Sequence, residues 1–222
     1  MEALPLREVI QGDAFTWLDE HPAEPGSSVI TSLPDLSELP ELGLEGWRSW
    51  FIAAAERVLR WLPDDGVAIF YQSDIRWQNV WIDKAHLVHC AVDNAGQKLV
   101  FHKIVCRSAP GTISWGRASY SHLLCAAKAA LAGSRKPGPD VLPDAGAMPW
   151  SRAMGVEACR LACSFLRDNT STRRVVDPFC GKGTALAVAN SYGFDALGVE
   201  RSGRRCRAAR KLLIDVASTE RP

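Results

Sequence analysis

The chain has 222 residues, with 26 Lys and Arg against 25 Asp and Glu, and a formal net charge of +1. This near balance excludes an overall basic surface, so any large nucleic-acid interface has to come from local patches. The length suits one α/β domain, expected to span residues 1–222 and to bury a good-sized core.

Seven cysteines are scattered along the chain without a Cys-x-x-Cys pair. Their odd number, the lack of a signal peptide and the lack of an apolar run of membrane length predict a cytoplasmic protein that does not enter a membrane. Cys159 and Cys163 share the face of a predicted helix, but no second pair has zinc-site spacing, so no metal is expected.

In the first part of the chain, residues 1–128, predicted strands and helices alternate. Apolar runs predict strands near residues 7, 28, 67, 99 and 122. The spacing of apolar residues predicts helices over 14–19, 47–62 and 77–94. The continuous run at 67–71 is typical of a central strand in a parallel sheet.

The second part begins with residues 129–148, a stretch rich in Pro, Gly and polar side chains that predicts a linker. Residues 149–222 then contain predicted helices over 149–166 and 203–216, with strands near 174 and 196. The chain therefore has seven predicted strands.

The stretch RVVDPFCGKGT, residues 174–184, reads as the end of a buried strand, a tight turn and the start of a helix. Gly181 and Gly183 let the backbone of the turn approach a ligand closely. A further short strand ends in the acidic Glu200, roughly twenty residues downstream, where a carboxylate can accept hydrogen bonds from ribose hydroxyls. This layout is that of a nucleoside-binding βαβ unit.

Two common phosphate-binding patterns do not fit this turn. A P-loop needs a glycine where Val176 stands and a Ser or Thr where Gly183 stands, although Lys182 is in place. The dinucleotide pattern Gly-x-Gly-x-x-Gly lacks its third glycine.

The octapeptide DPFCGKGT, residues 177–184, resembles the Asp-Pro-Phe-x-Gly-x-Gly-Thr motif of amino-methyltransferases that use S-adenosylmethionine. The opening of the chain, a strand ending in Gly12-Asp13 and a second strand running into Ser32-Leu33-Pro34-Asp35, is similar to that of β-class DNA methyltransferases. The resemblance implies an α/β fold, a seven-stranded Rossmann-like class I methyltransferase sheet in circularly permuted order. The catalytic segment would follow the second strand, and the cofactor turn would follow the sixth.

The resemblance also implies which residues bind S-adenosylmethionine. Glu200 would hold the ribose, and Asp13 would meet the adenine amino group, unless it is a plain turn aspartate. The amino-acid end would lie against the turn and the N-terminus of its helix. The residues implied there are Asp177, Pro178, Phe179, Gly181, Gly183 and Thr184.

The expected catalytic tetrapeptide departs from the family pattern. Ser32 and Pro34 fit it, but Leu33 replaces a proline and Asp35 replaces the aromatic residue that stacks on a flipped-out base. Asp35 and Glu38 could serve as bases for an acceptor that must lose a proton, or they could cap the following turn. The Ser-Leu-Pro order is closer to the Asn-Leu-Pro of some RNA methyltransferases.

Candidates for contact with the substrate lie elsewhere in the sequence. Trp115, Arg117 and Tyr120, between two predicted strands, could stack on a base. Arg152 stands where the family often has a basic residue. Residues 129–148 are too few to form the target-recognition domain that the family usually inserts there.

The sequence thus predicts an enzyme, a nucleobase methyltransferase that uses S-adenosylmethionine. RNA, especially tRNA, is favoured as the partner because the recognition domain is missing and the tetrapeptide is altered. A DNA adenine or cytosine amino-methyltransferase is the alternative within the class. An inactive methyltransferase-like subunit that binds a partner is the alternative outside it.

Overall fold

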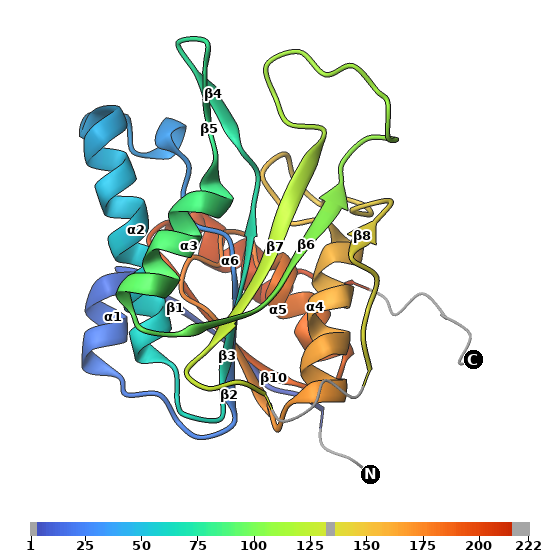
Figure 1. Cartoon of the computed structure of the whole chain (residues 1–222). Helices are drawn as coiled ribbons and strands as arrows, with labels where there is room; N and C mark the ends of the chain where they lie inside the picture. Colours follow the sequence, from blue (N-terminus) through green and yellow to red (C-terminus); the bar gives the residue numbers. More distant parts are fainter. Residues whose placement is uncertain (1–3, 132–135, 215–222) are drawn as a thin grey trace.

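A computed structural model describes residues 4–131 and 136–214, and its described strands include a mixed eight-stranded sheet (Figure 1). Five neighbouring strands of this sheet run parallel, whereas β7 is antiparallel to both of its neighbours, β3 and β6. Across the sheet the order is β1 (Arg7–Gln11), β10 (Asp195–Glu200), β9 (Arg174–Asp177), β2 (Ser27–Thr31), β3 (Val67–Gln72), β7 (Tyr120–Ala127), β6 (Lys98–Cys106) and β8 (Val141–Leu142).

Helices cover both faces of the sheet (Figure 1). One face carries α1 (Ala14–Glu20), α2 (Gly43–Trp61) and α3 (Lys84–Asn94), and the other carries α4 (Val156–Asn169), α5 (Thr184–Ser191) and α6 (Gly203–Lys211). Two short 3-10 helices, η1 (Leu36–Glu38) and η2 (Pro40–Leu42), precede α2. Among the described helices, none combines the length and the apolar character needed to cross a membrane.

Strand β3 shows how the sequence builds two cores. All six of its residues are buried, and successive side chains of a strand point to opposite faces. Val67, Ile69 and Tyr71 pack with α4 and α5, whereas Ala68 and Phe70 pack with α2 and α3. A continuous apolar run is therefore what this position requires.

All seven predicted strands are confirmed. The predicted sixth and seventh strands, β9 and β10, lie beside β1, and the pair β6–β7 lies toward the opposite edge. For the main sheet the prediction of seven strands was one short, because β8 pairs with β6 inside the predicted linker. Part of that linker, residues 132–135, lies outside the described residues.

The predicted helix over 77–94 was wrong in its first part. Residues 75–82 form a separate hairpin of β4 (Ile75–Trp77) and β5 (Val80–Ile82), and the helix begins only at Lys84. Gln78 and Asn79 turn the hairpin with positive φ angles of 46° and 64°, a conformation that suits a two-residue hairpin loop.

Two further helix boundaries also differ from the prediction. The helix predicted over 149–166 begins at Val156, because residues 148–152 form an irregular segment instead. The helix predicted over 203–216 ends at Lys211, and residues 215 and 216 lie outside the described part of the chain.

Gly198 of β10 gives a test of this packing. A Cβ there would lie 2.5 Å from Leu186 Cδ1 and 2.7 Å from Cys180 Sγ, so Gly198→Ala should destabilise the fold by about 1–3 kcal/mol. Gly46→Ala is the matched control, because its Cβ would meet only Leu42 Cβ at 3.5 Å in helix α2. It should stabilise by about 0.5–1 kcal/mol. Urea unfolding measures both, and a neutral Gly198→Ala would contradict the packing.

Candidate functional site

A cavity of about 730 Å³ opens where four parallel strands end. Its walls come from the segments that follow β1, β2, β9 and β10, together with the N-terminus of α5 and residues 150–154. Because the carboxyl ends of parallel strands meet at one edge of the sheet, segments far apart in sequence converge there. From the predicted site, the lining includes Asp13, Ser32, Pro34, Glu38, Arg152, Asp177, Pro178, Phe179, Gly181, Thr184 and Glu200.

The turn between β9 and α5 requires its glycines. Gly181 and Gly183 have φ angles of +54° and +82°, in the left-handed region that side chains disfavour. A Cβ on Gly181 would lie 2.9 Å from the ring of Trp150, and one on Gly183 would lie 2.9 Å from Ala209 Cβ. Gly183 thus packs under α6 rather than lining the cavity, while Gly181 lines it.

Asp177 forms part of the cavity wall and is almost fully buried. Its Oδ1 accepts hydrogen bonds from Thr31 Oγ1 at 2.6 Å and from the backbone N–H of Phe179 at 3.1 Å. Burial raises the pKa of Asp177 to about 7, and the nearby charge of Glu200 adds to this shift. The aspartate therefore both shapes the turn and carries a titratable proton near neutral pH.

Glu200 stands at the end of β10 on the same cavity. Its Oε1 accepts a hydrogen bond of 2.7 Å from the backbone N–H of Ser202, and its Oε2 lies 3.8 Å from Arg205 Nη1. The carboxylate is thus fixed in orientation at the strand end, and its role in ribose binding stays a prediction.

Two buried polar atoms in the cavity wall have no hydrogen-bond partner among the described residues: Thr184 Oγ1 and Trp150 Nε1. The Trp150 ring also has Lys182 Nζ at 5.4 Å and Arg205 Cζ at 5.8 Å from its centroid. Buried polar atoms are normally paired, so these two are positioned for a ligand with acceptor groups. Trp150 was not among the predicted site residues, although it lies beside Arg152 in the sequence.

Three aromatic rings from different elements form another wall. Phe15 stacks on Trp50 at a centroid distance of 5.8 Å, and Phe179 meets both rings edge-on at 6.4 Å and 6.1 Å. All three line the cavity. Apolar spacing predicts the two helices that carry Phe15 and Trp50, but such spacing cannot separate a core position from a cavity wall.

Asp35 does not line the cavity, although Ser32, Leu33 and Pro34 do. Its carboxylate caps η1 by accepting from the N–H of Leu36 at 2.8 Å. It also forms an ion pair of 3.2 Å with Lys84, which is buried. Burial lowers the pKa of Lys84, and the charge of Asp35 opposes that shift. The structure thus gives Asp35 the capping role that the sequence left open.

Glu38 completes the same capping box, and its charge is already paired. Its Oε2 accepts from the backbone N–H of Asp35 at 3.3 Å. Its Oε1 lies 3.1 Å from Arg152 Nη1 and 3.4 Å from Arg205 Nη2, in the cavity wall. Arg152 is therefore brought to the site, where it pairs with this carboxylate.

Asp13 has the turn role that the sequence allowed, and its contact with adenine stays a prediction. It caps α1 by accepting from the N–H groups of Phe15 and Thr16, and it also lies in the cavity wall. A capping carboxylate keeps acceptor capacity on its second oxygen, so the cap does not prevent ligand contact.

The predicted stacking residues are not in the cavity wall. Trp115 is 90% exposed on the loop 107–119, and Arg117 is exposed beside it. Tyr120 is half-buried at the start of β7, where its hydroxyl donates to Asp74 Oδ2 over 3.4 Å. Of the three residues, Tyr120 belongs to a second, separate cluster.

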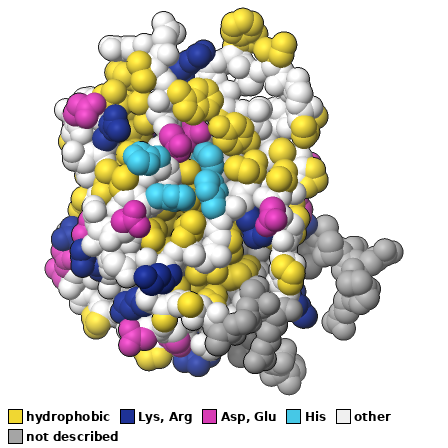
Figure 2. Space-filling view, viewed as in Figure 1, with side chains coloured by type: hydrophobic (Ala, Val, Ile, Leu, Met, Phe, Trp, Pro, Cys, Tyr) yellow, Lys and Arg dark blue, Asp and Glu magenta, His cyan; other side chains and the backbone are white. Residues whose placement is uncertain are grey.

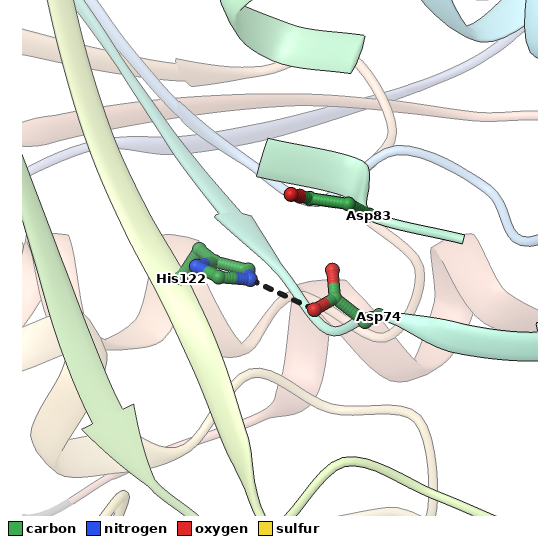
Figure 3. Close-up of side chains that lie close together, drawn as sticks. All are labelled: Asp74, Asp83 and His122. Carbon is green, nitrogen blue, oxygen red and sulfur yellow. Dashed lines mark hydrogen bonds and ion pairs between the residues drawn. The ribbon is translucent and has the colours of Figure 1, made fainter. Parts of the chain in front are cut away.

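That cluster is centred on the buried Asp74 (Figure 3). Asp74 lies 3.1 Å from His122 Nε2 and accepts hydrogen bonds from Trp81 Nε1 and the N–H of Lys84. Burial alone would raise the pKa of Asp74, but the hydrogen bonds of His122 and Lys84 hold it below its usual range. Ligand-type atoms of Asp74, Asp83 and His122 lie within 4.8 Å of one another, close enough for a metal ion.

No protein-family model matches the sequence, and no curated protein matches it. Solved structures do match. A putative DNA modification methylase from Thermus thermophilus, complexed with S-adenosyl-L-methionine, has a TM-score of 0.71 at 21% identity over 93% of both chains. The chain has the fold of a methyltransferase. PvuII DNA methyltransferase, cytosine-N4-specific, has a TM-score of 0.71 at 17% identity, over 97% of this chain and 91% of that one.

A third structure, the M1.HpyAVI–SAM complex, has a TM-score of 0.60 at 13% identity over 93% of this chain and 98% of that one. The similarity to amino-methyltransferases expected from the sequence is thus confirmed at the level of the fold. The expectation of an RNA or tRNA substrate is not supported, because two of these three names specify DNA and none specifies RNA.

The buried Asp177 predicts a pH dependence of stability. Aspartate has a pKa near 3.9 in an unfolded chain, whereas Asp177 has a pKa of about 7 in the folded protein. Between these two pH values the folded protein keeps a proton that the unfolded chain has lost. The free energy of unfolding should therefore fall as pH rises from about 4 to 7. Asp177→Asn keeps the Oδ1 acceptor, removes this decline and should be more stable above pH 7 by up to about 4 kcal/mol.

Urea unfolding between pH 4 and 8 measures the effect. Asp64→Asn is the control, because Asp64 is an exposed carboxylate paired with Lys128 on the surface. If the wild type and Asp177→Asn gave parallel stability curves, the raised pKa of Asp177 would be contradicted.

Proposed function

We propose that this protein is an S-adenosylmethionine-dependent methyltransferase that methylates an exocyclic amino group of a base in DNA. The observation that carries the proposal is the meeting of two segments in one cavity. The DPFCGKGT turn follows β9, the Ser32-Leu33-Pro34 segment follows β2, and β2 and β9 are paired neighbours. A methyl donor and an acceptor held by these two segments would be side by side.

The residues in the cavity fit S-adenosylmethionine, which would supply a methyl group activated on a sulfonium. The α5 N-terminus has no side-chain cap, so its amides suit the carboxylate of the amino-acid end. Trp150 Nε1 and Thr184 Oγ1 can donate to the same end. Glu200 faces the cavity as an acceptor for ribose hydroxyls, and Asp13 as an acceptor for the adenine amino group.

The acceptor side favours an amine. Ser32 and the carbonyl groups of its segment can accept hydrogen bonds from an amino group and orient its lone pair. Pro34 O already accepts from Trp47 Nε1 at 3.2 Å, which holds the segment in place, and a carbonyl has a second lone pair. Asp35, the candidate base, is committed to its cap and to Lys84. An exocyclic amine needs little help from a base, so this arrangement suffices.

The aromatic wall replaces the missing stacking residue of the tetrapeptide. Phe15, Trp50 and Phe179 offer ring surface beside Ser32. A base brought out of a duplex is held by stacking on such rings. DNA is chosen over RNA because the structural neighbours with a printed substrate are DNA enzymes.

The proposal includes the circularly permuted strand order expected from the sequence. In this chain the Ser32 segment precedes the glycine turn, yet β9 and β10 return to lie between β1 and β2. It also includes a catalytic role for Ser32 and Pro34.

The test of the proposed function is methyl transfer from radiolabelled S-adenosylmethionine to duplex DNA or tRNA, followed by mass spectrometry of the nucleosides. If tRNA were methylated and duplex DNA were not, the substrate would be RNA rather than DNA.

Cofactor affinity gives a direct prediction. Glu200→Ala should weaken S-adenosylmethionine binding by roughly 1.5–3 kcal/mol, because it removes charge-assisted hydrogen bonds. Gly181→Val should weaken it at least as much, because a side chain there meets Trp150 in a left-handed backbone. Isothermal calorimetry measures both, with Glu8→Ala, an exposed acid on β1, as the control. Unchanged affinity in both variants would remove the basis of this site assignment, whereas no binding by the wild type would support an inactive partner-binding subunit.

Turnover separates the roles of Ser32 and Asp35. Ser32→Ala should lower the single-turnover rate by roughly a hundredfold while leaving cofactor affinity intact. Asp35→Asn keeps a capping side chain but leaves the buried Lys84 without its charged partner. It should therefore cost about 1–3 kcal/mol of stability and leave the rate per folded molecule unchanged. A large rate loss in Asp35→Asn that shrinks with rising pH would make Asp35 the base after all.

A further inference from the structure

Two segments project from the sheet edge at which the cavity opens (Figure 1). The β4–β5 hairpin, residues 75–82, follows the carboxyl end of β3, which is parallel to β2. The loop 107–119 joins the end of β6 to the start of β7, and both strands are antiparallel neighbours. Because β7 is also antiparallel to β3, this loop lies at the same edge. We call these two segments the arms.

The arms expose aromatic and basic side chains together. In the hairpin, Trp77 and Trp81 are 39% and 45% exposed, and in the loop Trp115 is 90% exposed. Figure 2 shows apolar side chains gathered on the upper part of this face, above a group of histidines and acids.

The charged side chains of the two arms are all positive. They carry three arginines, Arg76, Arg107 and Arg117, and neither segment contains an Asp or Glu. In a chain with almost equal numbers of acids and bases, these arginines place positive charge on an aromatic surface, while the acids Asp74 and Asp83 lie at the base of the hairpin.

The arms are built on one anchor. The backbones of Ile75 and Arg117 form a β-bridge between them. Asp74, buried at the base, accepts hydrogen bonds from Trp81 of the hairpin at 3.2 Å and from Tyr120 at the end of the loop at 3.4 Å. The exposed rings therefore project from a fixed base.

The anchor touches the cavity wall through one residue. The backbone N–H of Lys84 donates to Asp74 at 2.8 Å, and its Nζ lies 3.2 Å from Asp35, which follows Pro34 of the cavity wall. The base of the arms is thus one lysine side chain away from the segment that would hold the target base.

We propose that the two arms bind duplex DNA beside the target base, with the arginines on phosphates and the tryptophans against sugars and bases. This inference rests on the proposed function. Guanidinium groups suit phosphate contacts, and aromatic rings stack on bases of any sequence. The absence of acids from both arms favours a polyanion over an apolar protein partner. The arms would supply contacts to the substrate without a separate recognition domain, for which residues 129–148 are too few.

The test compares two double variants by fluorescence anisotropy with a labelled duplex of about twenty base pairs, titrated with salt. Arg76→Ala/Arg117→Ala should weaken binding by about tenfold and lower the salt slope by about 2. Lys98→Ala/Lys128→Ala is the matched control. It also removes two positive charges, but these lie at the ends of β6 and β7 that face away from the arms. It should bind as the wild type does. Trp115→Ala should weaken binding, and Trp115→Phe should restore it.

Equal losses in the arm and control variants, or none in either, would overturn the role of the arms. Arm-dependent binding of a labelled single-stranded RNA, with duplex DNA binding independent of the arms, would overturn DNA as the occupant. S-adenosylmethionine calorimetry should be unchanged in all variants. If the wild type methylates DNA and the arm variants have the same KM for DNA, only the role of the arms is refuted. If the wild type transfers no methyl group to DNA, the proposed function is refuted.

Discussion

A buried hydrogen bond between Thr31 and Asp177 holds the two halves of the cavity together. Thr31 is the last residue of β2, directly before Ser32, and Asp177 is the last residue of β9, directly before the glycine turn. The same Asp177 oxygen accepts from Phe179, whose ring belongs to the aromatic wall. One carboxylate therefore fixes the distance between the proposed acceptor segment and the proposed cofactor turn.

Charge around the cavity is arranged in alternation, and this limits which groups can do chemistry. Glu38 lies between Arg152 and Arg205, and Arg205 also reaches Glu200. Asp35 and Lys84 form a further pair behind the wall. Each of these carboxylates already has a cationic partner, so the site is better suited to orienting a nucleophile than to deprotonating it. This electrostatic arrangement agrees with an amine as acceptor.

The sequence predicts the parts of the fold that depend on local pattern. The apolar run predicts β3, and the glycines at 181 and 183 predict a turn in which both have positive φ angles, although only Gly181 lines the cavity. The β4–β5 hairpin was missed because Gln78 and Asn79 adopt positive φ without a glycine to signal it. The pairing of Asp35 with Lys84 was missed because those residues are 49 positions apart and meet only through tertiary packing.

The proton on Asp177 also has a thermodynamic meaning for ligands. With a pKa raised to about 7 by burial, Asp177 gains or loses this proton close to neutral pH. A cation placed in the cavity favours the ionised form, so its binding is coupled to proton release. A neutral ligand of the same shape gains no such advantage. The cavity would therefore distinguish a sulfonium from the thioether left after methyl transfer, and the distinction would change with the pH of the surroundings.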